Sequence, residues 1–228
     1  MCAARCPDTA TASCECAQPS SPASSPGHPV ATYQRKDAFH QRAKREGFHS
    51  RAAYKLDEIQ QKYRLLKRGQ KVVDLGCWPG GWLQVTERVI GSRGRIVGVD
   101  LAEVEASFPG ANVTILCGDF TDAEVADRIL EALGGPADVV LSDAAPKLTG
   151  VRTTDRAREE ALLESIEALV PKLLRPGGDL LLKIMEGPEA QKIDKRLRRL
   201  FETAKTVKPR ASRKGTTERY LLARAFKP

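Results

Sequence analysis

The stretch of sequence that decides the fold is Val72-Val73-Asp74-Leu75-Gly76-Cys77-Trp78-Pro79-Gly80-Gly81-Trp82. An apolar strand ends here in an acid and a glycine-rich turn, and a helical pattern follows. Glycine lets backbone approach a ligand without a Cβ in the way. A doubly wound sheet binds its nucleotide-like ligand at the junction of its first strand and first helix. The turn lacks the G-x-G-x-x-G spacing, so it does not favour a pyrophosphate-bearing dinucleotide.

Strands and helices alternate downstream of this turn, which is the rhythm of an α/β protein with a doubly wound, mostly parallel sheet. Upstream, a basic helix is expected from Tyr33 and a second from Ser50, with Ala53, Leu56, Ile59 and Tyr63 on its core face. The predicted strands are 71–75, 95–100, 113–118, 138–143, 179–185, 205–209 and 219–225; the predicted helices are 81–90, 122–133, 155–174 and 188–202.

Residues 1–32 form a Ser-, Pro-, Ala- and Thr-rich leader with almost no bulky apolar residue. Such a segment cannot bury enough surface to offset its ordering entropy, so we expect a disordered leader and a folded domain over residues 33–228. Four of the six cysteines lie in this leader, but no C-x2-C pair occurs, and we expect no metal site. The sequence shows neither an apolar run of eighteen residues nor a secretory signal. We therefore expect no membrane association, and a cytoplasmic monomer.

The net charge of +8 is unevenly distributed along the chain. Residues 33–68 hold eleven Lys and Arg against four acids, and residues 192–228 hold thirteen against three. The remainder of the chain is therefore acidic. A solvated surface is the simple interpretation of one basic run. Two basic segments around an acidic centre favour a polyanion-binding surface, and hence a nucleic-acid partner.

Three predicted strands each end in a polar signal that suits an adenosine-containing cofactor. Asp100 follows the second strand by about the spacing at which a carboxylate accepts ribose hydroxyls. Asp119 ends the third strand, where it can bond an adenine amino group, with Phe120 against the ring. Each acid alone could be only a helix cap, but together with the glycine turn they predict a cofactor site.

Polar residues on the fourth and fifth strands are expected at the rim of the same site. Asp143 ends the fourth strand, and Lys183 lies in the otherwise apolar fifth strand, where an unpaired ammonium would be costly to bury. If Lys55 of the second basic helix and Glu218, just before the last strand, fold over the same rim, the site holds two lysines and two carboxylates. This set suits alkylation of a ribose 2′-hydroxyl, because a lysine crowded by a second lysine holds its proton less tightly and can serve as a base.

At these residues the chain resembles the FtsJ/RrmJ family of ribosomal RNA 2′-O-methyltransferases. The resemblance covers residues 33–228. Its matching strings are Ser50-Arg-Ala-Ala-Tyr-Lys55, Asp74-Leu-Gly-x-x-Pro-Gly-Gly-Trp82, Gly118-Asp119-Phe120, Ser142-Asp143-x-x-Pro146, Pro176-Gly-Gly178 with Lys183, and Ser212-Arg with Glu218-x-Tyr220.

The resemblance implies a Rossmann-like class I methyltransferase fold: a seven-stranded, mostly parallel sheet with helices on both faces. It implies S-adenosylmethionine as cofactor and a uridine of 23S ribosomal RNA, within the large subunit, as target. Lys183 would be the base. The implied catalytic residues are Lys55, Asp143, Lys183 and Glu218, and the implied cofactor residues are Gly80, Trp82, Asp100, Asp119 and Asp143.

The sequence also departs from the family pattern. Cys77-Trp78 stands where small residues are usual, and Ala144-Ala145-Pro146-Lys147 replaces a Met-Ala-Pro-Asn string. Two alternatives therefore stay open: a methyltransferase acting on a transfer RNA ribose, and a catalytically silent RNA-binding or ribosome-assembly factor. Cys77 and Cys117 could also suggest a cysteine nucleophile, although neither follows a proline in the target loop.

Overall fold

The structure is a computed structural model that describes residues 38–110, 112–185, 187–212 and 215–228. All of these lie in one compact unit, Lys36–Pro228. The strands are β1 (Lys71–Leu75), β2 (Arg95–Asp100), β3 (Val113–Cys117), β4 (Ala137–Ser142), β5 (Leu174–Ile184), β6 (Phe201–Val207) and β7 (Arg219–Phe226). The helices are α1 (Ala38–Arg45), α2 (Ala53–Tyr63), α3 (Gly81–Ile90), α4 (Ala123–Leu133), α5 (Arg152–Leu173) and α6 (Pro188–Arg199).

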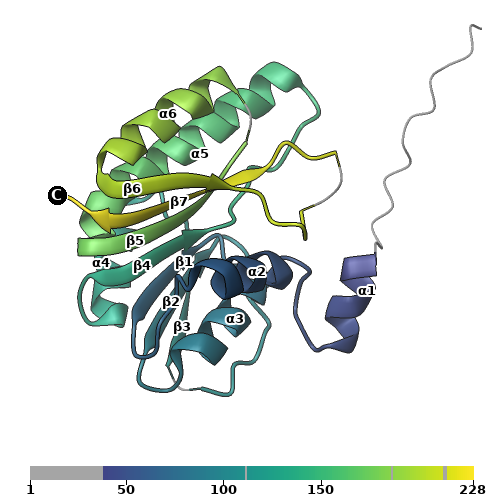
Figure 1. Ribbon diagram of the computed structural model, residues 1–228, viewed down its shortest axis with the longest axis vertical. Coiled ribbons are helices and arrows are strands. Elements are labelled where there is room, and N and C mark those ends of the chain that lie inside the picture. Colours follow the sequence, from purple (N-terminus) through teal and green to yellow (C-terminus); the bar gives the residue numbers. More distant parts are fainter. Residues whose placement is uncertain (1–37, 111, 186, 213–214) are drawn as a thin grey trace, which may run out of the picture. The chain divides into compact units, whose positions relative to one another are not determined.

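The strands form one seven-stranded sheet in the order β3-β2-β1-β4-β5-β7-β6 (Figure 1). The pairs from β3 through β5 are parallel, whereas β7 runs antiparallel to both β5 and β6. A sheet whose strands are mostly joined by helices is parallel, and the direct β6–β7 connection allows the antiparallel pair. The predicted α/β class and mostly parallel sheet are confirmed.

Helices cover both faces of the sheet, as expected. One core forms between the sheet and α4, α5 and α6, and the other between the sheet and α2 and α3. Successive strand residues alternate between these two cores: Leu180 and Leu182 face the first, and Leu181 faces the second. This alternation matters for the site, because it determines which strand residues face α2.

The elements nearest the glycine turn have the predicted bounds, namely β1, α3 and β2. Helix α4 ends where Gly134 adopts the left-handed conformation at φ 72°, which glycine allows without a steric penalty. Asp122 precedes α4 in the N-cap position, but its side chain makes no capping hydrogen bond. The bounds of this helix thus agree with the predicted range of 122–133 to within one residue.

Several boundaries differ from the prediction. Helix α2 begins at Ala53 rather than Ser50, and β5 begins at Leu174 rather than at residue 179. Helix α6 ends at Arg199, and β6 begins at Phe201 rather than at residue 205. Phe201 is buried in the core and pairs with Phe226 of β7, so a long-range pairing replaces the helical pattern that continues locally.

The predicted leader over residues 1–32, its four cysteines and the start of the first basic helix at Tyr33 lie outside the described residues. Over the described part of the chain, no helix is long and apolar enough to cross a bilayer.

Candidate active site

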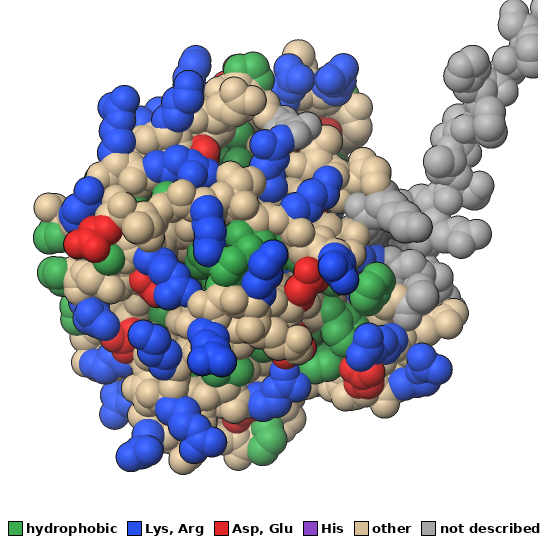
Figure 2. All heavy atoms as spheres, viewed as in Figure 1, with side chains coloured by type: hydrophobic (Ala, Val, Ile, Leu, Met, Phe, Trp, Pro, Cys, Tyr) green, Lys and Arg blue, Asp and Glu red, His purple; other side chains and the backbone are tan. Residues whose placement is uncertain are grey.

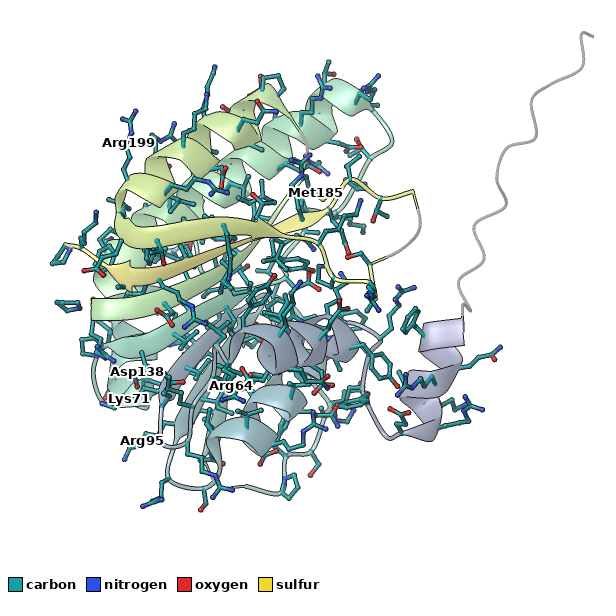
Figure 3. The ribbon with its side chains drawn as sticks, viewed as in Figure 1. Arg64, Lys71, Arg95, Asp138, Met185 and Arg199 are labelled. Carbon is teal, nitrogen blue, oxygen red and sulfur yellow. The ribbon has the colours of Figure 1, made fainter. Side chains whose placement is uncertain are left out.

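Strand register brings three polar side chains together at the carboxyl ends of the central strands. Ser142 of β4 pairs with Leu182 of β5, so Asp143 follows beside Lys183. Lys183 in turn pairs with Tyr220 of β7. Lys183 Nζ lies 3.1 Å from Asp143 Oδ1 and donates to the Asp143 backbone oxygen. In Figure 3, Met185 lies just beyond this end of β5, while Lys71 and Arg95 lie at the opposite end of the sheet.

Lys55 and Glu218 complete the group that the sequence predicts. Lys55 is 8% exposed, and its Nζ lies 3.0 Å from Glu218 Oε1 and 3.5 Å from Asp143 Oδ2. Helix α2 places Lys55 over the face of the sheet on which the side chains of Leu181 and Lys183 lie. Two lysines and two carboxylates therefore share one buried cluster, which we call the tetrad. Residues from α2, the β4 and β5 ends and the segment before β7 are brought together in it.

Asp143 is the centre of the tetrad. Burial raises the pKa of Asp143, but the attraction of Lys183 and Lys55 and a hydrogen bond from Tyr220 outweigh it. The net pKa of Asp143 lies below its usual range, so the group stays ionised at neutral pH. An ionised, buried carboxylate between two ammonium groups holds both lysine heads in a fixed direction.

Tyr220 belongs to the same cluster, although sequence reasoning did not assign it a role. Its hydroxyl donates to Asp143 Oδ1 at 2.6 Å and accepts from Lys55 Nζ at 3.0 Å. Burial, and then the charges of Asp143 and Glu218, raise the pKa of Tyr220 well above its ordinary value, so the phenol keeps its proton. The signal was present in the sequence, because Glu218 and Tyr220 are two residues apart and a strand places such residues on one face.

A cavity of about 830 Å³ opens beside Asp143. Ligand cavities commonly measure about 300–1,000 Å³, so this one can hold a nucleoside-sized molecule. Of the predicted cofactor residues, Asp100, Asp119 and Asp143 line it, and Phe120 does so as well. The tetrad and the cavity thus share the Asp143 carboxylate.

The two strand-end acids in the cavity are oriented by backbone amides. Asp100 accepts hydrogen bonds from the N–H groups of Trp78 and Ala102, at 2.8 and 3.0 Å. Asp119 accepts one from Thr121 at 2.9 Å. A carboxylate has about four acceptor positions, so each acid can still accept hydrogen bonds from a ligand. The amide donors fix the direction in which the remaining positions point.

The glycine turn after β1 has little room for a side chain at Gly76 and Gly80. Gly76 has φ +79°, and a Cβ there would lie 2.6 Å from the Ala144 Cβ. The turn therefore passes directly against the residues that follow β4 and line the cavity. Gly80 has φ +102°, and a Cβ there would meet Phe108 at 3.1 Å. These close approaches explain why the turn needs glycine at both positions.

Trp78 and Trp82 have different surroundings. Trp78 lines the cavity and is 58% exposed. Trp82 is 3% exposed; its indole N–H donates to the Ala52 oxygen, and its ring lies 5.8 Å from that of Tyr220. Gly80 and Trp82 thus lie at the start of α3, while the three predicted acids line the cavity. The Trp82 side chain supports α2 and the tetrad.

Asp74 is a second residue to which the sequence reasoning assigned no role. It is buried at the end of β1, and its Oδ2 has no hydrogen-bond partner in the described part of the chain. Burial, together with repulsion from Asp143 and Asp100, holds the pKa of Asp74 well above its usual range. The sequence signal for a role of Asp74 was an acidic residue within an otherwise apolar strand. The site therefore contains one carboxyl that resists ionisation beside others that are charged.

Cys77 does not have the surroundings of a nucleophile. It is buried, and burial raises the pKa of its thiol, so the reactive thiolate is disfavoured. Cys117 is exposed, and its Sγ lies 3.6 Å from the Leu101 oxygen.

Comparison with known proteins identifies the family. Residues 48–226 match the model of the FtsJ-like methyltransferases. The chain belongs to the FtsJ-like methyltransferase family. Two relatives named ribosomal RNA large subunit methyltransferase E are 48% identical over 192 residues (Pseudomonas aeruginosa) and 44% identical over 194 residues (Methanothermobacter thermautotrophicus). The alignments cover 84% and 85% of this chain, and 91% and 92% of the respective relatives.

Solved structures agree with this assignment. A Plasmodium falciparum protein described as a ribosomal RNA methyltransferase has a TM-score of 0.68 and 30% identity, covering 78% of this chain and 98% of that one. Aeropyrum pernix fibrillarin, solved with S-adenosyl-L-methionine bound, has a TM-score of 0.54 at 18% identity, covering 75% of this chain and 73% of that one. The second likeness concerns the fold alone and confirms the predicted class I methyltransferase architecture.

The raised pKa of Asp74 predicts how stability depends on pH. Because the folded-state pKa exceeds the unfolded value of about 3.9, wild-type stability falls by about 1.4 kcal/mol per pH unit between the two values. Asp74→Asn removes this ionisation. We expect the variant to gain stability relative to wild type as the pH rises from 4.5 to 8, measured by urea unfolding of both proteins. An equal stability difference at both pH values would contradict the raised pKa.

Proposed function

We propose that this chain transfers a methyl group from S-adenosylmethionine to a ribose 2′-hydroxyl of large-subunit ribosomal RNA, at a uridine of 23S ribosomal RNA. The tetrad beside the cavity is the observation that carries this proposal, in a chain that belongs to a methyltransferase family. The names of the relatives favour large-subunit ribosomal RNA over transfer RNA as the substrate. An intact, buried tetrad favours an enzyme over a silent assembly factor.

The residues around the cavity fit S-adenosylmethionine. Asp100 has free acceptor positions for two ribose hydroxyls and Asp119 for an adenine amino group, with Phe120 beside it. Gly76 and Trp78 of the glycine turn line the cavity and would hold the rest of the cofactor, whereas the predicted residues Gly80 and Trp82 do not line it and would act by shaping the turn and the start of α3. When bound, the cofactor supplies a methyl group activated on a positively charged sulfonium. The Asp143 carboxylate at the junction of cavity and tetrad favours that charge.

Lys183 is the residue that would accept the proton. Its ammonium group, paired with Asp143 at rest, would first release a proton to solvent, so that the neutral amine acts as the base. A ribose 2′-hydroxyl must lose its proton as its oxygen attacks a methyl group, and a positioned side-chain base typically contributes 10²–10⁴-fold to such a step. Asp143 holds the Lys183 amine at 3.1 Å, and Lys55 with Glu218 forms the other half of the cluster. Because the methyl donor is already activated, positioning supplies much of the remaining effect, up to about 7–11 kcal/mol in well-aligned cases.

A second cavity, of about 500 Å³, is the proposed site for the target nucleotide. It is lined by Met185, two residues after Lys183, and by Thr217, immediately before Glu218. None of the four tetrad residues lines it, but its lining comes within one or two residues of the tetrad along the chain. Arg152 and Arg156 of α5 also line it, together with Asp155 and Glu159, and the two arginines would supply positive charge for a phosphate. In this arrangement the cofactor and the nucleotide would reach the tetrad from separate cavities.

Replacing Lys183 tests the catalytic assignment. We expect Lys183→Ala to lower kcat by at least 10²-fold, because no other base replaces it, while the dissociation constant for S-adenosylmethionine measured by calorimetry changes less than threefold. In cells lacking the protein, wild type should restore 2′-O-methyluridine in 23S ribosomal RNA, measured by nucleoside mass spectrometry, and Lys183→Ala should not. Lys172→Ala, at an exposed position of α5 outside both basic segments, is the control. Turnover retained by Lys183→Ala would remove this lysine from the mechanism.

Tryptophan fluorescence tests the cofactor cavity. Because Trp78 lines the cavity and Trp82 is buried away from water, S-adenosylmethionine should shield mainly Trp78. We expect cofactor to shift emission to shorter wavelength and reduce acrylamide quenching in wild type, and to do neither in Trp78→Phe. Calorimetry checks that the variant still binds. A shift that persists in Trp78→Phe would place the cofactor elsewhere.

We also propose that residues 33–228 form the complete catalytic domain. The tetrad and both cavities are built from residues after 50. Deletion of residues 1–30 should therefore leave kcat and KM unchanged within about twofold in a methyl-transfer assay. Loss of transfer by a truncated protein with an unaltered circular dichroism spectrum would show that the leader takes part.

A further inference from the structure

The two basic segments of the chain meet in the folded protein. The guanidinium of Arg224 donates to the backbone oxygen of Tyr63, and Lys205 Nζ lies 3.8 Å from the centre of the Tyr63 ring. Glu58 of α2 accepts the backbone N–H groups of Arg210 and Ala211 at 2.7 and 3.3 Å. Charges that lie more than 130 residues apart in the sequence thus share one surface, formed by α2 and β6.

A shallow groove of about 210 Å³ lies between these two elements. Lys62 and Tyr63 of α2, Thr206 of β6 and Lys208 contribute to its walls. We call it the α2–β6 groove. Figure 2 views the face on which α2 and β6 lie, and Lys and Arg side chains are spread over that face with few acidic side chains between them.

Lys62 lines the groove and Lys205 lies beside it, against the Tyr63 ring, and internal ion pairs do not explain either lysine. Among the residues that the structure describes, neither Lys62 nor Lys205 forms an ion pair with an acid. Lys62 lies in the last turn of α2, where a cation is favourable for the helix dipole. Lys205 has no such role, because it comes from a strand. Glu58, an acid in the groove, is occupied by two backbone amides.

Tyr63 holds Lys205 in place. Lys205 Nζ lies 3.8 Å above the Tyr63 ring, and Lys62 Nζ lies 5.3 Å from the same ring. A cation–π contact of this kind restricts a side chain that would otherwise sample many rotamers. A lysine that is already ordered loses less entropy when it binds an anion. The aromatic ring therefore prepares two ammonium groups for one ligand.

The groove is aligned with the tetrad along α2. Lys55 and Lys62 are seven residues apart, which is about two helical turns or roughly 10 Å, and places them on the same side of the helix. The other wall reaches the tetrad as well, because Val207 in the groove pairs with Tyr220, two residues after Glu218. An RNA strand with its target nucleotide at the tetrad can thus continue along α2 toward Lys62.

We propose that the α2–β6 groove binds the phosphate backbone of the RNA beside the target nucleotide, which rests on the proposed function. Lysine heads along a small surface groove suit a run of phosphates, since phosphate contacts position a nucleic acid without reading its sequence. The groove would hold the substrate in register while a different set of residues carries out the chemistry.

Charge reversal tests this surface. The variant Lys62→Glu/Lys205→Glu should bind large ribosomal subunits, purified from cells lacking the protein, at least tenfold more weakly in filter binding at low salt. The slope of log affinity against log salt concentration should become less steep by about 1.4–1.8, which corresponds to two lost phosphate contacts. KM for subunits should rise with kcat at saturation unchanged. The variant Tyr63→Leu, which keeps both lysines, should lose about two- to fivefold in affinity.

The matched control is Arg93→Glu/Lys172→Glu, which makes the same charge change at exposed positions outside both basic segments. It should leave subunit affinity within about twofold of wild type. Equal losses of affinity in the two double variants would attribute the effect to net charge and would overturn the proposal. Unchanged affinity in the Lys62/Lys205 variant would overturn it as well. Both variants should bind S-adenosylmethionine as wild type does. If wild type itself failed to bind or methylate subunits, the proposed function would fail, and not the groove alone.

Discussion

The Asp143 carboxylate is the interaction on which the arrangement of the site depends. Two ammonium groups and a phenol, from α2, β5 and β7, converge on it. Burying an ion costs several kcal/mol unless it is paired and hydrogen-bonded. The carboxylate and the two ammonium groups would therefore each be unfavourable in this position without the others. The cluster therefore fixes the position of α2 over the sheet and the direction in which β7 presents Tyr220. The same requirement that stabilises the packing also aligns the groups that we propose for the chemistry.

Strand alternation explains how an apolar core and a polar site occupy one face of the sheet. Val139 and Leu141 of β4 face the core beneath α2 and α3, and Asp143 continues that alternation beyond the strand end. Leu181 and Lys183 follow the same rule in β5. The apolar residues lie inside and the polar ones at the carboxyl ends, where parallel strands leave a crevice. The packing pattern and the site are consequences of the same register.

The fold could be predicted best where local signals agree with tertiary structure. The bounds of β1, α3 and β2 follow directly from the glycine turn and its flanking apolar runs. The start of β6 could not be found locally, because residues 200–204 continue a helical pattern and only pairing with β7 makes Phe201 a strand residue. Lys183 and Asp143 could be expected from chemistry, as polar residues on buried strands. Lys55 and Glu218 needed the family resemblance, because their approach depends on contacts 163 residues apart in the sequence.

The charge distribution of the chain corresponds to two opposite electrostatic requirements of the proposed reaction. A cationic cofactor favours acids around its cavity, and Asp100, Asp119 and Asp143 lie there. A polyanionic substrate favours cations, and the α2–β6 surface supplies them. If the two charge types were intermixed, each would weaken the attraction for the other's ligand. The tetrad lies where the two regions meet, and Lys55 belongs to the basic segment while Asp143 belongs to the acidic one. The ion pair between them thus joins the binding surface for one reactant to the binding surface for the other.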